Sequence, residues 1–188
     1  MKSNILLVDD EVSVLKALQR SLIDEDLDVY VAECAAEGLK LIEQHKFKVV
    51  VSDERMPDMC GSEFLSIISL QHPEVVRITL TGQASIEAAM TAVNQGEIYR
   101  FLLKPWNDTE LTLAIRSAIE KYDLEMKNRK LLSLIRNQAL KLEQIEKKHP
   151  GLTNIDRGED GSFMLKELND DEVAKIMKEC RVEIPKEE

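Results

Sequence analysis

The apolar run Val49–Ser52 stops at a carboxylate, Asp53, and a loop containing Pro57 and Gly61 follows it. Such a run is typical of a buried strand in a parallel sheet. In open α/β sheets, ligands bind at the carboxyl ends of the strands. The sequence therefore predicts a functional edge at Asp53.

Three further short runs end in a side chain that can do chemistry. Ile5–Val8 leads into two acids, Arg77–Leu80 into a hydroxyl, and Tyr99–Leu103 into an ammonium group. In order along the chain these groups are Asp9, Asp10, Thr81 and Lys104. Because the carboxyl ends of parallel strands meet at one edge, we expect all of them to lie near Asp53.

Helical patterns separate the strands, which include a further one at residues 28–32. Apolar residues recur every three or four positions in the segments between the strands. The expected helices cover residues 11–23, 35–45, 62–70 and 85–95, and a last one begins at Asp108 or Thr109. Five alternations of strand and helix predict an α/β fold, a doubly wound parallel sheet of five strands with helices on both faces.

Three carboxylates at one edge repel each other unless a cation neutralises them. Mg²⁺ suits such a site, since it prefers oxygen ligands and keeps several waters. We expect Asp10 and Asp53 to bind it directly, with the backbone carbonyl of Arg55 as a third ligand and Asp9 acting through water. Each acid taken alone is also compatible with a helix cap or an ordinary strand end, and only the shared edge favours the metal.

The same edge can bind and receive a phosphoryl group. An aspartate carboxylate is a known covalent phosphoryl acceptor, which makes Asp53 the candidate. Lys104 supplies a charge and Thr81 a hydroxyl to the phosphoryl oxygens. The sequence Leu103-Lys104-Pro105 also suggests a cis peptide bond before Pro105.

Residues 4–122 resemble the receiver domain of bacterial two-component response regulators. The motifs that carry the resemblance are Val8-Asp9-Asp10-Glu11, Ser52-Asp53, Met56-Pro57, Gly61, Leu80-Thr81-Gly82 and Phe101-Leu102-Leu103-Lys104-Pro105. The resemblance implies a flavodoxin-like fold with strand order 2-1-3-4-5, dependence on Mg²⁺, and phosphorylation of Asp53 by a histidine kinase.

The resemblance also assigns Thr81 and Phe101 to the two switch positions of the family. Phe101 stands where Tyr is commoner, so a hydroxyl at that position is absent. The local sequence of residues 97–106 resembles receivers fused to HD-type cyclic-dinucleotide phosphodiesterases or to hydrogenase-type transcription activators. No family resemblance extends beyond about residue 123.

The last helix has no evident stop, since neither Gly nor Pro occurs between Trp106 and Pro150. Its second half has a heptad pattern with five apolar positions out of seven. The positions are Leu124 (d), Asn128 (a), Leu131 (d), Ile135 (a), Gln138 (d), Leu142 (a) and Ile145 (d). This pattern favours a two-stranded coiled coil and a homodimer through residues 124–146. The alternative is a helix that folds back on its own chain.

Pro150 and Gly151 break this helix, so we expect three parts: a receiver at residues 1–123, a helical linker at 124–149 and a small acidic tail at 150–188. In the tail, residues 152–155 and 162–165 are expected to form a hairpin, followed by a short helix from Asn169 or Asp170. Residues 156–167 match a calcium-binding loop in part, but an acidic hairpin turn is the better interpretation.

The net charge of −10 disfavours nucleic acid and anionic membranes as partners. Three widely spaced cysteines, Cys34, Cys60 and Cys180, together with the lack of a signal sequence or long apolar run, predict a cytoplasmic protein. No His is followed by Asp, so there is no HD motif. We expect a non-enzymatic output through protein interaction or dimerisation; the alternative is a receiver fragment of a larger regulator.

Overall fold

The computed structural model describes residues 2–82, 85–94, 97–148, 156–157 and 163–164. The strands are β1 (Ser3–Val8), β2 (Leu27–Ala32), β3 (Val49–Asp53), β4 (Val76–Thr81), β5 (Arg100–Leu103), β6 (Asp156–Arg157) and β7 (Phe163–Met164). The helices are α1 (Val12–Ser21), α2 (Ala35–Gln44), α3 (Gly61–Gln71), α4 (Ile86–Asn94) and α5 (Asp108–Lys148).

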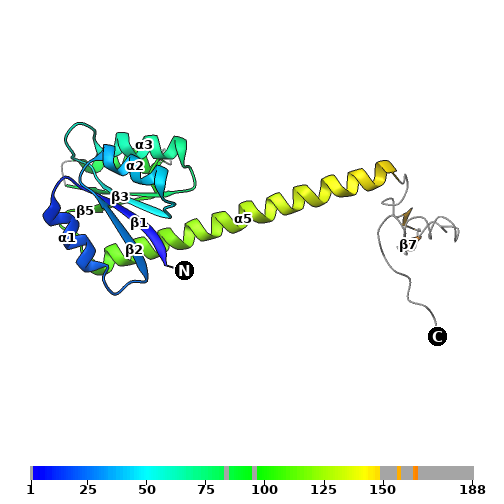
Figure 1. Cartoon of the computed structure of the whole chain (residues 1–188), viewed down its shortest axis with the longest axis horizontal. Helices are drawn as coiled ribbons and strands as arrows, with labels where there is room; N and C mark the ends of the chain where they lie inside the picture. The colour runs from blue at the N-terminus through cyan, green and yellow to red at the C-terminus, as the bar shows by residue number, and fades with distance from the viewer. Residues whose placement is uncertain (1, 83–84, 95–96, 149–155, 158–162, 165–188) are drawn as a thin grey trace. The chain divides into compact units, whose positions relative to one another are not determined.

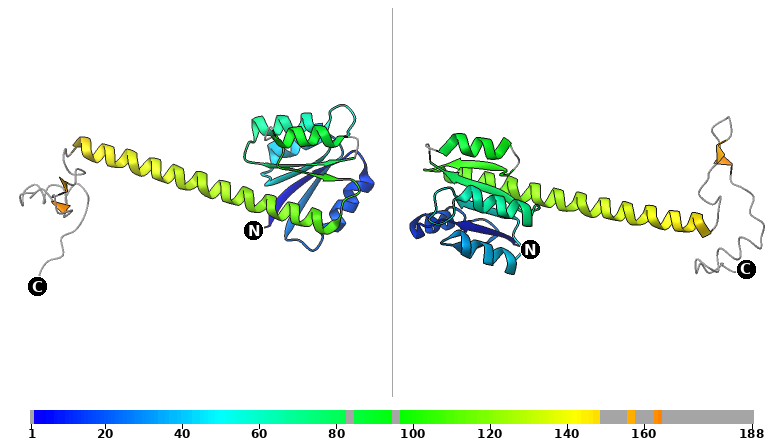
Figure 2. Two further views of the ribbon diagram at one scale, coloured as in Figure 1. Left: turned by 180° about the vertical axis from the view of Figure 1, so that it is seen from behind. Right: turned by 90° about the horizontal axis from the view of Figure 1, so that it is seen from above.

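Strands β1 to β5 form one parallel sheet in the order β2-β1-β3-β4-β5. This is the flavodoxin-like order that the family resemblance implies. Figures 1 and 2 show α2, α3 and α4 over one face of the sheet, and α1 with the first part of α5 over the other. The predicted doubly wound α/β fold is therefore confirmed.

Apolar side chains fill both interfaces between the sheet and its helices. Alternate residues of β1 and β3 go to opposite faces, as the period of a strand requires. Ile5 and Val49 pack toward α1 and α5, whereas Leu6 and Val50 pack toward α2 and α3. With helices on both sides, the strands carry continuous apolar runs, and their ends are where polar side chains collect.

The predicted boundaries of β1 to β5 and of α1 to α5 lie within two residues of the observed ones, and several coincide with them. The sequence predicted α1 over residues 11–23, but it ends at Ser21, and Leu22 and Ile23 form a turn. The start of α5 was predicted at Asp108 or Thr109, and it begins at Asp108. Asn107 caps it, because its Oδ1 accepts hydrogen bonds from the backbone N–H groups of Thr109 and Glu110. The peptide bond between Lys104 and Pro105 is cis, as predicted.

Helix α5 runs for 41 residues without interruption, which confirms the predicted long helix. The chain separates into two units at residue 132, and the second contains the end of α5 and a short antiparallel pair of strands, β6 and β7. β6 lies at Asp156–Arg157, after the predicted segment 152–155. That segment, the calcium-loop residues 158–162 and the predicted tail helix lie outside the described residues. None of the helices in the described parts of the chain combines the length and the hydropathy that a membrane span requires.

Gly61 is required by a close approach between the start of α3 and the end of β3. A Cβ at this position would overlap the backbone carbonyl oxygen of Asp53. The backbone N–H of Gly61 also donates to the carbonyl oxygen of Glu54 at 3.0 Å, which closes the loop between β3 and α3. The local backbone that carries Asp53 therefore has no room for a larger residue at position 61.

Gly61→Ala is expected to lower the free energy of unfolding by about 3 kcal/mol, since backbone must move to relieve the overlap. Gly82→Ala is the matched control, because a Cβ there meets nothing within 4 Å. Urea denaturation of both variants measures the difference. Equal stabilities for the two variants would show that the loop adapts without cost.

Candidate functional site

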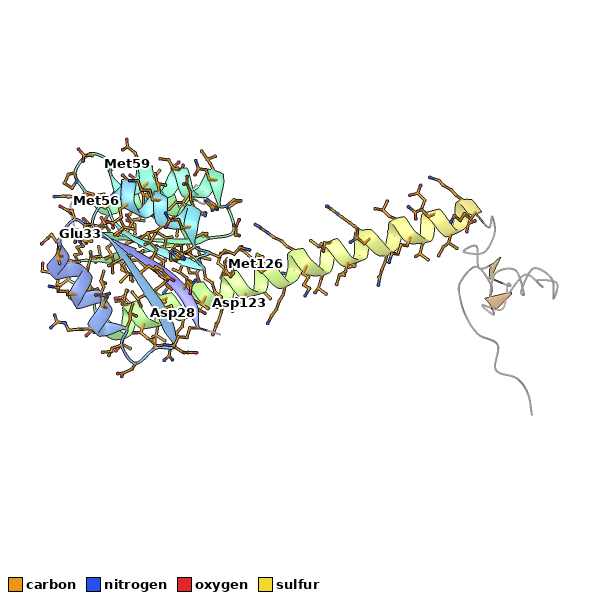
Figure 3. The ribbon with its side chains drawn as sticks, viewed as in Figure 1. Asp28, Glu33, Met56, Met59, Asp123 and Met126 are labelled. Carbon is orange, nitrogen blue, oxygen red and sulfur yellow. The ribbon has the colours of Figure 1, made fainter. Side chains whose placement is uncertain are left out.

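The carboxyl ends of β1, β3, β4 and β5 bring the predicted site residues to one edge of the sheet. Asp9 follows β1, Asp53 ends β3, Thr81 ends β4 and Lys104 follows β5. In Figure 3, Met56 and Met59 of the loop after β3 mark this edge, and Asp28 and Asp123 lie at the opposite one. The predicted convergence is therefore found in the structure.

Lys104 lies between two of the carboxylates. Its Nζ is 2.7 Å from Asp9 Oδ2 and 2.6 Å from Asp53 Oδ1. The other oxygen of each acid accepts a backbone hydrogen bond: Glu11 N–H donates to Asp9 Oδ1 at 2.9 Å, and Arg55 N–H donates to Asp53 Oδ2 at 3.1 Å. Both carboxylates are thus fixed in orientation by one ammonium and one amide.

Burial and charge act in opposite directions on this pair. Asp9 is completely buried, and desolvation raises the pKa of its carboxyl above the usual value, although the hydrogen bond and charge of Lys104 lower it. Burial lowers the pKa of Lys104, but its hydrogen bonds to Asp53 and Asp9 outweigh this effect and raise it. The balance differs between the two groups because Lys104 has two acids beside it, whereas Asp9 shares one ammonium with Asp53.

Asp10 completes a group of three acids. One carboxylate oxygen from each of Asp9, Asp10 and Asp53 lies within 4.8 Å of the others. Asp10 is exposed, so the cluster is open to solvent on its side. Three negative charges against the one positive charge of Lys104 leave a deficit that a divalent cation would balance, and the all-oxygen donor set is the type that Mg²⁺ prefers.

The two predicted switch residues lie on neighbouring strands. Thr81 is fully buried, and its hydroxyl donates to the carbonyl oxygen of Gly82 at 3.2 Å. Phe101 is half-buried and pairs in register with Thr79, two residues before Thr81 on β4. The backbone N–H of Lys104 donates to the carbonyl of Thr81 at 2.8 Å, so the backbone links these strand ends directly.

Sequence reasoning did not identify two residues beside this site, Glu54 and Thr79. Glu54 follows Asp53 directly, and its carboxylate accepts hydrogen bonds from Ser62 at 2.9 Å and Thr79 at 3.4 Å. Two features of the sequence could have pointed to them: Glu54 is a second acid beside Asp53, and Thr79 lies two residues from Thr81 and hence on the same face of β4. Neither feature indicates which partner the acid contacts.

Residues 5–116 match the family described as the response regulator receiver domain. The chain is 36% identical over 124 residues to the hydrogenase transcriptional regulatory protein HoxA of Cupriavidus necator. The aligned residues make up 66% of this chain and 26% of that protein. The matched part is therefore about a quarter of that relative's length.

Solved structures are also similar to this chain over about two thirds of its length. A crystal structure described as adenylate cyclase from Rhodopirellula baltica is 37% identical with a TM-score of 0.68, covering 71% of this chain and 98% of that one. The signal receiver domain of an HD domain-containing protein from Pseudomonas fluorescens is 37% identical with a TM-score of 0.63. This match covers 67% of this chain and 93% of that receiver domain. The predicted likeness to receivers of hydrogenase-type regulators and of HD-domain proteins is confirmed.

The raised pKa of Asp9 predicts a defined dependence of stability on pH. When a chelator removes metal ions, the native state holds the Asp9 proton more tightly than the unfolded state does. Wild type therefore loses stability as the pH rises through the pKa that Asp9 has in the folded protein. Asp9→Asn lacks this loss and is expected to be more stable than wild type at pH 7 by about 1 kcal/mol.

That advantage should shrink as the pH falls toward 3.8, the ordinary pKa of an aspartate, because the wild-type carboxyl is then increasingly protonated in both states. Urea denaturation at several pH values measures it, with the exposed Asp24→Asn as the control. If Asp9→Asn is less stable than wild type at pH 7, the ion pair with Lys104 outweighs desolvation.

Proposed function

Because the chain belongs to the response regulator receiver domain family of two-component systems, we propose that it accepts a phosphoryl group on Asp53 from a histidine kinase or a phosphotransfer protein. The observation that carries this proposal is the Lys104 ammonium held between Asp9 and Asp53 at one end of the sheet. The protein would then be a phosphoacceptor whose only chemistry is the gain and loss of that group.

The transfer step needs little chemistry from the protein. A carboxylate oxygen of Asp53 attacks the phosphorus of a phosphohistidine, the new P–O bond forms as the P–N bond breaks, and the electron pair stays on the imidazole nitrogen. Asp53 is only 6% exposed, so little of its surface is open to the donor. The ammonium of Lys104 now pairs with Asp53, and after transfer it would instead pair with a negatively charged phosphoryl oxygen.

The donor set supports Mg²⁺ as the metal of this site. Asp10, Asp53 and the backbone carbonyl of Arg55 would hold it directly, and Asp9 through water. The chemistry that a bound Mg²⁺ would supply is to offset the charge of the acids and of the phosphoryl oxygens. The exposed Asp10 gives the ion a route to the buried pair from solvent.

The switch follows from the buried hydroxyl of Thr81. When a phosphoryl group is present, Thr81 would exchange its bond to Gly82 for a phosphoryl oxygen, which moves the end of β4 toward Asp53. Phe101 on the adjacent strand would fill the space that Thr81 leaves. Phosphorylation of Asp53 would thereby change the positions of Thr81 and Phe101 on the face formed by β4 and β5.

Helix α5 is well placed to carry that change. Asp123 pairs with Lys48, just before β3, at 2.7 Å, and Arg129 lies 3.9 Å from Glu74, just before β4. The ammonium of Lys48 also lies 5.9 Å from the ring centre of Tyr122. These contacts place one face of α5 beside the loops that enter the central strands, so a movement of β4 has a route to the helix.

We propose a second copy of this chain as the partner of α5 over residues 124–146. The apolar seam residues Leu124, Leu131, Ile135, Leu142 and Ile145 are between 42% and 60% exposed. Leaving such surface in water costs about 25 cal/mol per Å², and pairing two copies removes that cost. Parallel pairing also places Lys141 against Glu146 of the mate and Asn128 against its own copy, which favours one register.

The output that we propose is protein interaction in the cytoplasm, with neither nucleic acid nor membrane as a direct partner. The acidic charge supports this choice, as do the free thiols of Cys34 and Cys60. The second candidate is a receiver within a larger regulator, since the matched segment is about a quarter of the HoxA relative. The length of the natural reading frame distinguishes the two.

Asp53→Asn is expected to abolish Mg²⁺-dependent incorporation of phosphate from a small phosphodonor, because an amide is a poor nucleophile. Asp58→Asn is the matched control in the same loop; this residue is exposed and has a φ of 68°, which Asn tolerates. Radiolabel incorporation measures both. Labelling of Asp53→Asn at the wild-type level, or labelling unaffected by chelator, would refute the assignment.

Leu131→Asp/Ile135→Asp is expected to weaken self-association by at least about a hundredfold, since two unpaired charges would be buried in the seam. Met126→Asp/Leu140→Asp carries the same charges at exposed positions outside the seam and should dimerise like wild type. Sedimentation equilibrium measures all three proteins. A monomeric wild type, or equal weakening by both double variants, would exclude the predicted register.

A further inference from the structure

We propose that Glu54 is a positioning residue for the metal ion: it holds the loop that carries the Arg55 carbonyl in the conformation that binds Mg²⁺. The inference rests on the proposed metal site and concerns a residue that does not itself coordinate the ion. Glu54 lies in the chain between the phosphoacceptor Asp53 and the proposed carbonyl ligand. Any rotation of its backbone therefore displaces that carbonyl.

The backbone of Glu54 is tied at both ends. Its N–H donates to the carbonyl oxygen of Leu80 on β4 at 3.0 Å, and its own carbonyl accepts the N–H of Gly61 at 3.0 Å. The first bond extends the pairing of β3 with β4 by one residue. The second closes the loop onto the first residue of α3.

The side chain of Glu54 then joins the same two elements independently of the backbone. Ser62 Oγ, in the first turn of α3, donates to Glu54 Oε1 at 2.9 Å. The hydroxyl of Thr79, on β4, lies 3.4 Å from Glu54 Oε2 and 3.3 Å from the carbonyl oxygen of Ser52, so it shares one proton between two acceptors. Thr79 is only 1% exposed, so its hydroxyl has no access to water and hydrogen-bonds to these two acceptors instead.

This arrangement separates two tasks within one loop. Asp53 and its neighbours supply charge and oxygen ligands, whereas Glu54 supplies rigidity through four hydrogen bonds to α3 and β4. Loss of a partner of this kind, which holds a ligand without touching the metal, typically lowers metal affinity by about tenfold to a hundredfold. The loop between β3 and α3 (residues 54–60, here called the metal loop) is thereby hydrogen-bonded to β4, the strand that ends in Thr81.

The contacts also place Glu54 in line with the proposed switch. Ser52, Thr79 and Phe101 occupy one row across β3, β4 and β5. Glu54 contacts the middle member of that row. A movement of β4 on phosphorylation would therefore be felt in the metal loop, and metal binding would in turn favour one position of β4, since such coupling is reciprocal.

The test measures Mg²⁺ affinity without any phosphodonor, from the rise in melting temperature as MgCl₂ is added. The fluorescence of Trp106, the only tryptophan, gives a second readout two residues from Lys104. Glu54→Ala removes both side-chain bonds and is expected to raise the apparent dissociation constant about tenfold. Glu54→Gln removes the charge but keeps an acceptor for one hydroxyl and a donor for the other, so it should stay within about twofold to threefold of wild type.

Ser62→Ala tests the same contact without altering the loop itself and should give an intermediate loss, which serves if Glu54→Ala does not fold. Glu43→Ala, at an exposed position on α2, is the matched control for removing a glutamate. Wild-type affinity in both Glu54→Ala and Ser62→Ala would overturn the proposal. So would equal weakening by Glu54→Gln and Glu54→Ala, since charge alone would then be responsible. A wild type that does not respond to Mg²⁺ would instead refute the metal site.

Discussion

The arrangement of the functional site depends on one interaction, the ammonium of Lys104 between Asp9 and Asp53. Three acids gathered at one sheet edge repel each other, and one of them is entirely buried. Lys104 removes part of that repulsion through ion pairs of 2.7 and 2.6 Å to two of the acids. The remaining negative charge makes the same edge attractive to a divalent cation, and a cation would in turn make it attractive to a phosphoryl group.

The site is also the place where strand ends are connected to one another. Backbone bonds run from Lys104 to Thr81 and from Glu54 to Leu80, so the strand ends are linked in pairs as well as through the side chains. Helix α5 packs on the sheet through its buried apolar residues, and its Asp123 and Arg129 form ion pairs with Lys48 and Glu74 at the other end of the domain. A small shift of β4 can therefore alter both the metal loop and the helix, which is how we propose that one phosphoryl group changes association between chains.

Much of this arrangement was predictable from the sequence because parallel strands deliver their last residues to one edge. Asp9, Asp53, Thr81 and Lys104 each end or follow an apolar run, and that pattern alone was sufficient to bring them together. The strand order came from the family resemblance, since periodicity carries no information about which strands are neighbours. The contact of Glu54 with Thr79 and the pair of Lys48 with Asp123 were not predicted, because long-range pairing of polar side chains leaves no spacing pattern. The Asn107 cap was missed because Asp108 and Thr109 are comparably good capping residues.

The central claim is that the acid at the end of β3 is the one that becomes phosphorylated, and chemical trapping tests it most directly. Borohydride reduces an aspartyl phosphate to homoserine, which peptide mass spectrometry locates in the chain. After incubation with a small phosphodonor and Mg²⁺, we predict homoserine at position 53, and none when Mg²⁺ is chelated. Homoserine at position 9, 10 or 58 instead, or at position 53 without the metal, would contradict the account.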